Sequence, residues 1–159
     1  MRKLFFSMFL GILTGGIFAA SASAFHYENG RFGYGVDVPE GFAPQPEAEN
    51  GDGRVFISRS PQGEIAVWAQ YNALEQTLAE AADFAAGERV IAYRRLNGKQ
   101  NWFVLSCLDD EGKVVYLRQQ LSGDTIYALR FTYPQSEQKA FDTIIANTVT
   151  SFKIPPANR

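Results

Sequence analysis

Hydrophobic side chains alternate with polar ones through three short segments in the second half of the chain. The segments span residues 101–108, 113–121 and 125–133, and polar turns that contain Gly112 and Gly123 separate them. Their Val, Leu, Tyr, Phe and Trp side chains suit a pleated, half-buried surface, and glycine takes the positive φ angle that tight turns need. The pattern predicts a three-stranded antiparallel meander.

Loop lengths predict the register of this meander. With residues 109–112 and 122–124 as the loops, Val104 lies opposite Leu117, and Leu117 lies opposite Leu129. Apolar side chains then fall on both faces of the sheet. A sheet that is open to water on one side keeps one polar face, so this pattern indicates that both faces are covered, at least in part.

Similar patterns predict the strands that precede the meander. Four further strands are expected, over residues 32–39, 55–58, 64–71 and 89–96. Residues 25–31 are expected to be a loosely held segment before the first of them.

Two helices are expected as well. Thr77 and Glu80 form a capping box that starts the first helix, and Gly87 lies beyond its end. The second helix follows Pro134, with Ser136 as its cap, and its apolar side chains recur one turn apart: Ala140, Phe141, Ile144, Ile145, Thr148, Val149 and Phe152. This stripe has to pack on the meander. The order of strands, helix, strands and helix has no alternating βαβ units, which predicts an α+β fold with a mainly antiparallel sheet.

The first 24 residues have the pattern of a cleaved signal peptide. A basic start precedes an apolar stretch over residues 4–20, and small side chains at positions 22–24 suit signal peptidase. An uncleaved membrane anchor is the alternative, but the stretch is shorter than the ~20 residues of a spanning helix. We expect cleavage after Ala24, a single domain over residues 25–159, and a periplasmic or extracellular location without stable membrane insertion.

The charge of the chain disfavours two classes of partner. Its formal net charge is −2 at pH 7, and loss of Arg2 and Lys3 with the signal peptide takes it to about −4 by the same count. The chain has no run of basic residues, which supply the affinity for nucleic acid and for anionic membrane surfaces. The expected partner is another protein of the cell envelope.

The sequence predicts no catalytic residue, no metal site and no cofactor. Cys107 is the only cysteine and His26 the only histidine. A nucleophilic thiol needs a basic partner, so Cys107 is expected to be a small buried side chain of a strand. His26 with the α-amine of Phe25 is a weak alternative as a Cu²⁺ site. The acidic turn Asp109–Gly112 lacks the alternate-residue spacing of a calcium loop.

Two arginines form the candidate binding site. In the predicted register, Arg118 and Arg130 lie near each other on neighbouring strands, beside Tyr116. Two guanidinium groups in an otherwise apolar face can hold a carboxylate or a phosphate. The alternative is that each arginine extends to solvent or pairs with an acid of the first helix, such as Glu80 or Asp83.

The chain resembles PsbP-like domains at both of its ends. A strand of glycine and aromatic residues, followed by proline and a further aromatic residue, spans Gly33–Phe42, and three short motifs close the chain: Tyr133-Pro134, Phe141-Asp142 and Ser151-Phe152. The resemblance implies an antiparallel sheet sandwiched between helices, a fold that DcrB-like exported proteins share. Function in this fold group is varied and mostly non-enzymatic. The metal-binding histidines discussed for PsbP have no counterpart here, since His26 is the only histidine.

These observations predict a non-enzymatic binding or accessory module of the cell envelope. The alternative is a domain, enzymatic or not, that binds a small anionic ligand through Arg118 and Arg130 beside Tyr116. The two hypotheses differ in what surrounds the arginines. A pocket lined by both arginines without acidic partners favours the anionic ligand, whereas carboxylate partners or an open surface favour the accessory module.

Overall fold

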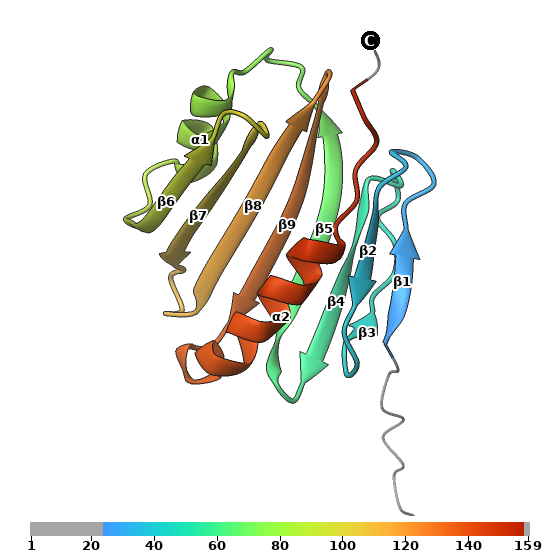
Figure 1. Ribbon diagram of the computed structural model, residues 1–159. Coiled ribbons are helices and arrows are strands. Elements are labelled where there is room, and N and C mark those ends of the chain that lie inside the picture. Colours follow the sequence, from blue (N-terminus) through green and yellow to red (C-terminus); the bar gives the residue numbers. More distant parts are fainter. Residues whose placement is uncertain (1–23, 158–159) are drawn as a thin grey trace, which may run out of the picture.

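A seven-stranded antiparallel sheet runs through the protein in the order β3-β4-β5-β9-β8-β7-β6 (Figure 1). The computed structural model describes residues 24–157. Its strands are β1 (Phe25–Glu28), β2 (Gly35–Val38), β3 (Ala43–Pro44), β4 (Gly53–Arg59), β5 (Gln62–Tyr71), β6 (Ile91–Asn97), β7 (Trp102–Leu108), β8 (Val114–Ser122) and β9 (Thr125–Tyr133). Its helices are α1 (Leu78–Ala86) and α2 (Gln138–Ser151), which a 3₁₀ turn at Gln135–Glu137 precedes. The predicted α+β class with a mainly antiparallel sheet is confirmed.

The predicted meander is present as β7, β8 and β9, but β8 is shifted by one residue from the predicted register. Leu117 lies opposite Leu105 of β7 and Arg130 of β9. The loops cause the shift, because the first spans residues 109–113, one residue longer than predicted, and the second spans only residues 123–124. A slip of one residue exchanges the two faces of a strand, so every side chain of β8 lies on the face opposite to the one predicted.

Apolar side chains gather in two clusters. The larger cluster joins β1, β2, β4, β5 and β9 to α2, where Phe141 is fully buried. The predicted stripe of α2 packs on this cluster through four further side chains: Ile144, Ile145, Val149 and Phe152. The prediction that the stripe packs on the meander is only partly correct, because α2 contacts β9 of the meander and also β2, which lies outside it. The smaller cluster lies under α1 and combines the alanines of that helix with side chains of β7, β8 and β9: Phe103, Leu105, Leu121 and Ile126.

The two helices begin in different ways. The capping box predicted for α1 is confirmed, because Oγ1 of Thr77 accepts a hydrogen bond from the backbone N–H of Glu80, and the Glu80 carboxylate accepts one from the N–H of Thr77. Gly87 ends α1 with a positive φ of 54°. The cap predicted at Ser136 is wrong, since Ser136 lies inside the 3₁₀ turn and α2 begins at Gln138 without a side-chain cap.

The segment after residue 24 is a strand rather than the loosely held segment that the sequence predicts. β1 pairs with β2 along its whole length, and Tyr27 on β1 is buried. On its other side, β2 meets the chain that leaves α2 through two backbone hydrogen bonds between Gly35 and Lys153, each 2.9 Å long. β1 has only four residues, and an alternation this short does not predict a strand or its partner from the sequence alone.

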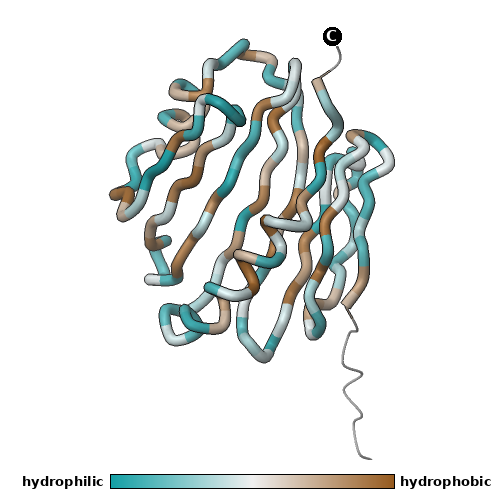
Figure 2. The backbone as a smooth tube through the Cα atoms, in the orientation of Figure 1, coloured by the Kyte–Doolittle hydropathy of each residue, from teal (hydrophilic) through white to brown (hydrophobic). Residues whose placement is uncertain are grey.

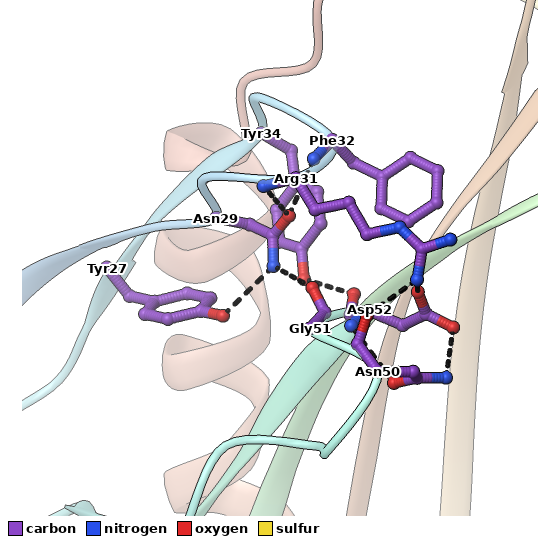
Figure 3. Close-up of polar contacts among 8 residues, drawn as sticks. All are labelled: Tyr27, Asn29, Arg31, Phe32, Tyr34, Asn50, Gly51 and Asp52. Carbon is purple, nitrogen blue, oxygen red and sulfur yellow. Dashed lines mark hydrogen bonds and ion pairs between the residues drawn. The ribbon is translucent and has the colours of Figure 1, made fainter.

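A buried asparagine ties the turn between β1 and β2 to the loop before β4 (Figure 3). Nδ2 of Asn29 donates to the carbonyl oxygen of Gly51 at 2.8 Å, and its Oδ1 accepts from the backbone N–H of Phe32 at 2.8 Å. Beside it, the guanidinium of Arg31 donates to the carboxylate of Asp52 at 2.5 Å. These contacts join two loops that are about twenty positions apart in the chain.

The predicted signal peptide lies outside the described residues, apart from its last position, so its cleavage stays a prediction. Among residues 24–157, no helix has both the length and the apolar character needed to cross a membrane.

Candidate functional site

Arg118 and Arg130 lie on opposite faces of the sheet, so they cannot hold one anion together as predicted. Arg118 lies opposite Leu129, and Arg130 lies opposite Leu117. Residues directly opposite each other share a face, and successive residues of a strand alternate between faces. The one-residue shift of β8 is the reason for the error. Tyr116 remains on the same face as Arg118, as predicted.

Arg130 has a carboxylate partner. Its Nη2 donates to Oε1 of Glu64 on β5 at 3.0 Å, and its guanidinium lies 5.8 Å from the ring centroid of Trp68. The acid therefore comes from a neighbouring strand rather than from α1, whose Asp83 forms an ion pair of 2.6 Å with Arg94. The positive charge of Arg130 is already compensated, which disfavours the binding of a further anion there.

Arg118 is partly buried and has no carboxylate within 4 Å among the described residues. Its guanidinium lies over the ring of Trp102, 4.4 Å from the centroid, and its Nη2 donates to Oε1 of Gln120 at 3.4 Å. Its Nε is buried without a hydrogen-bond partner in the part of the chain that the structure describes. Burial lowers the pKa of Arg118 from its usual value, although a guanidinium stays charged at neutral pH.

The turn between β6 and β7 holds the ring of Trp102 in place. The indole Nε1 of Trp102 donates to Oε1 of Gln100 at 2.9 Å. Asn101 takes a positive φ of 55°, which asparagine tolerates, and its Nδ2 donates to the carbonyl oxygen of Leu121 at the end of β8 at 2.9 Å. The indole is therefore oriented by the protein itself before any ligand binds.

Five aromatic and arginine side chains of β6, β7 and β8 share the face on which Arg118 lies, together with Asn97, Val104, Ser106 and Gln120 of the same strands. We call this surface the Arg–Trp face, and it consists of Tyr93, Arg95, Trp102, Tyr116 and Arg118. The guanidinium of Arg95 lies 5.6 Å from the centroid of the Trp102 ring, so two arginines flank one indole. In Figure 1, α2 lies in front of β9 and β5, and no helix lies in front of β6, β7 or β8.

The Arg–Trp face is polar and aromatic where it is open, and it joins the core at one side. Figure 2 shows a hydrophilic stretch in β8, which is the run Arg118-Gln119-Gln120. Arg118 and Gln120 lie on the side of the Arg–Trp face, and Gln119 lies on the opposite face. Tyr93 at the outer side is 49% exposed. Tyr116 at the inner side packs edge-on against Phe131, with 5.9 Å between the ring centroids. Burial raises the pKa of Tyr116, so its phenol stays protonated at neutral pH.

The arrangement of the Arg–Trp face suits binding. Arginine supplies a positive charge and several hydrogen-bond donors in one plane, and tryptophan and tyrosine supply large, rigid contact areas. Cys107, the lone thiol, is buried, and the imidazole of His26 lies 2.7 Å from the carboxylate of Asp37 on the separate β1–β2 sheet. Within residues 24–157, no group of three or more His, Cys, Asp or Glu side chains could hold a metal ion.

Sequence reasoning identified two members of the Arg–Trp face and missed the other three. Tyr116 and Arg118 are among the predicted site residues, whereas Tyr93, Arg95 and Trp102 are not. A signal for two of them was present, because Arg95 and Trp102 flank the turn at Asn97-Gly98. A hairpin around that turn brings its flanking side chains together on one face.

Comparison with known proteins shows the fold and no closer relationship. No protein family matches the chain by its sequence, and no curated protein is detectably similar to it in sequence. Among solved structures, cyanobacterial PsbP (CyanoP) from Synechocystis sp. PCC 6803 superposes with a TM-score of 0.60 at 14% identity, covering 92% of this chain and 99% of its own. The Ran-binding protein Mog1p from Saccharomyces cerevisiae superposes with a TM-score of 0.59 at 14% identity, covering 86% of this chain and 97% of its own. The predicted resemblance to the PsbP-like fold is confirmed.

Proposed function

We propose that the protein is a non-enzymatic binding module of the cell envelope that docks another protein on the Arg–Trp face. One observation carries the proposal, namely the partly buried Arg118, which is stacked at 4.4 Å on Trp102 and lacks a carboxylate partner among the described residues. A polar or charged group that is withdrawn from water without a partner costs free energy. A carboxylate on a docked protein would offset that cost.

The residue types of the Arg–Trp face favour a protein over a small molecule. Trp, Tyr and Arg are the side chains that most often dominate the binding energy of protein interfaces, and five of them lie together on this face. Small ligands are usually held in concave, mostly apolar pockets. Tyr93 and Arg95 instead stand exposed on an edge strand, which is better suited to the broad surface of a protein.

The proposal also concerns which parts of the sheet the two helices cover. We infer that the sheet is a PsbP-like sandwich with helical cover on both faces, each helix covering a different part. In β9, Leu129 belongs to the cluster under α2, and Ile126, which is an odd number of positions away, belongs to the cluster under α1. The Arg–Trp face is then the part of the sheet that α2 leaves open.

The solved structures of similar fold are compatible with a binding role, but they do not identify the partner. Mog1p is named as a Ran-binding protein, so the same fold serves protein binding elsewhere. At 14% identity the fold carries over and the partner does not. The expected partner, a protein of the cell envelope, therefore rests on the predicted signal peptide.

Export is the first prediction. The exported protein should begin at Phe25, because the small side chains at positions 22–24 suit signal peptidase. Intact-mass measurement of the protein from periplasmic and membrane fractions checks this. Phe25 begins β1, so cleavage after Ala24 leaves the whole β1–β2 sheet intact. A full-length chain found in the membrane fraction would contradict export in soluble form.

Docking on the Arg–Trp face is the second prediction. A photoreactive benzoylphenylalanine in place of Tyr93, which is 49% exposed, should form one defined crosslinked product in the native host. The same replacement at Ile57 is the matched control, because Ile57 is 42% exposed on β4, distant from the Arg–Trp face. Mass spectrometry of the product identifies the partner.

A second substitution tests whether Trp102 is central to that docking. Adding Trp102→Ala to the Tyr93 crosslinking variant should remove the product, since loss of a hot-spot aromatic costs ~2 kcal/mol or more, about 30-fold in affinity. Circular dichroism confirms that the variant remains folded. If no product forms at Tyr93, or if the same products form at Ile57, the Arg–Trp face is not the docking surface.

A further inference from the structure

The two edges of the large sheet are protected to different degrees. β3 forms one edge with only two residues, and one of them is Pro44, which has no backbone N–H to offer. β6 forms the other edge with seven residues, Ile91–Asn97, and five of these in succession are exposed. Natural proteins protect edge strands by short length, proline, charged side chains such as lysine, a bulge, or a covering helix or loop, because an unpaired strand edge attracts another strand.

β6 carries two such devices, namely an irregularity at its start and the charged side chains of Arg94 and Arg95 in its middle. The register with β7 is irregular between Ile91 and Tyr93, where one residue is left over. From Tyr93 to Asn97, the strand pairs residue by residue with β7 and contains neither proline nor lysine. Along this stretch, every second backbone N–H and C=O points away from the sheet and can pair with another strand.

The charges of β6 restrict what can pair with it. Its two charged side chains are Arg94 and Arg95. Arg94 is compensated by Asp83 at 2.6 Å, whereas Arg95 has no carboxylate within 4 Å among the described residues. A second copy of β6 would bring arginines against arginines in the middle of the strand, and like charges opposite each other destabilise a pair of strands. An acidic segment has the complementary charge.

We propose that the partner binds by adding an extended acidic segment to the free edge of β6. This deepens the proposed function and rests on it, because the segment would extend the Arg–Trp face. A residue opposite Arg95 lies on that face, and a carboxylate there meets the guanidinium of Arg95 beside Trp102. The residue two positions away lies opposite Tyr93 on the same face, where an apolar side chain fits. The expected pattern is therefore an apolar and an acidic residue two positions apart.

Designed peptides can test this before the partner is known. The probe is a capped peptide of about eight residues, within the ~3–10 residues of most strands, with threonine at odd positions and alternating valine and glutamate at even positions. A matched peptide carries lysine in place of glutamate. Backbone amide shifts of the isotope-labelled protein report binding. We expect saturating shifts centred on β6 with the acidic peptide and at least tenfold weaker binding of the lysine peptide.

Two N-methylated versions of the acidic peptide separate strand addition from contact by side chains alone. One carries methyl groups on the threonine nitrogens, and the other on the valine and glutamate nitrogens. In a strand pair, only one of these two sets of N–H groups faces the neighbour. We expect one version to lose binding at least tenfold and the other to bind within about threefold of the parent peptide.

Variants of the protein test the role of charge. Arg95→Glu should reverse the preference, so that the lysine peptide binds more tightly than the acidic one. Arg59→Glu is the matched control, because Arg59 is an exposed arginine at the end of β4, far from β6, and should keep the parent preference.

The outcomes distinguish strand addition from the wider proposal. Equal binding of both N-methylated peptides overturns strand addition, while the Arg–Trp face stays a docking surface if Tyr93 still crosslinks. Absence of binding, shifts away from β6, or equal affinity for acidic and lysine peptides likewise overturns the inference. Failure of the Tyr93 crosslink with successful peptide binding instead overturns the proposed docking on the face and leaves β6 as a strand-binding edge.

Discussion

Replacing Phe141 by alanine should destabilise the protein by about 3–5 kcal/mol, the range for removing a fully buried aromatic side chain. Phe141 of α2 is 0% exposed and stacks on Tyr133 of β9, with 4.1 Å between the ring centroids. It also meets Phe42 edge-on at 6.2 Å. Its ring lies so close to β5 that a Cβ atom at Gly63 would be 2.4 Å from Cζ of Phe141. Alanine would leave a cavity between α2 and the sheet that the surrounding strands cannot fill.

Urea unfolding followed by fluorescence or circular dichroism measures this loss. Phe84→Ala is the matched control, because Phe84 lies on α1 and is 69% exposed. It should change the free energy of unfolding by no more than about 0.5 kcal/mol. Equal effects of the two substitutions would mean that α2 does not pack on the sheet through Phe141.

Asn29→Ala should cost about 2–4 kcal/mol of stability, because it leaves buried polar groups without partners. Asn29 is 1% exposed. Its Nδ2 donates to the carbonyl oxygen of Gly51, and its Oδ1 accepts from the backbone N–H of Phe32, at 2.8 Å each (Figure 3). Nδ2 also donates to the phenol oxygen of Tyr27 at 3.3 Å. Each buried group that loses its partner costs about 1–3 kcal/mol, and the turn between β1 and β2 loses its tie to the loop before β4.

Thermal and urea unfolding check this prediction against Asn147→Ala. Asn147 lies on the exposed side of α2, where alanine is the better helix former, so this control should leave stability unchanged or slightly higher. Hydrogen exchange adds a local test, since the amides of β1 and β2 should lose protection first in the Asn29 variant. A melting temperature equal to that of the wild type would show that water replaces the Asn29 amide at little cost.

The two arginines show how a small error of register changes a functional hypothesis. The sequence placed Arg118 and Arg130 on one face because both loops of the meander were assigned lengths that differ by one residue from those in the structure. Side chains alternate with a period of two, so this slip moved all of β8 to the other face while β7 and β9 kept theirs. In the structure the two arginines are therefore separate. Arg118 lies beside Trp102, and Arg130 lies beside Trp68.

The sequence by itself determined the kinds of elements and most of their places. The alternation of β7, β8 and β9, the capping box at Thr77 and the apolar stripe of α2 are all local patterns with periods that the backbone imposes. The α+β class followed from their order, and the PsbP-like fold from short motifs at the two ends of the chain. Each element depends on residues that are close together in the sequence, and the class follows from the order of the elements.

The tertiary structure alone decided which side chains meet across strands. β1 is a strand because β2 lies beside it, and β2 is held in turn by the chain after α2, more than a hundred positions away. The Arg–Trp face exists because a five-residue loop and a turn at Asn101 set Trp102 against Arg118. A strand pattern predicts that a residue points to one of two faces, but the choice of face and of neighbour depends on loop geometry, and a single residue in a loop reverses it.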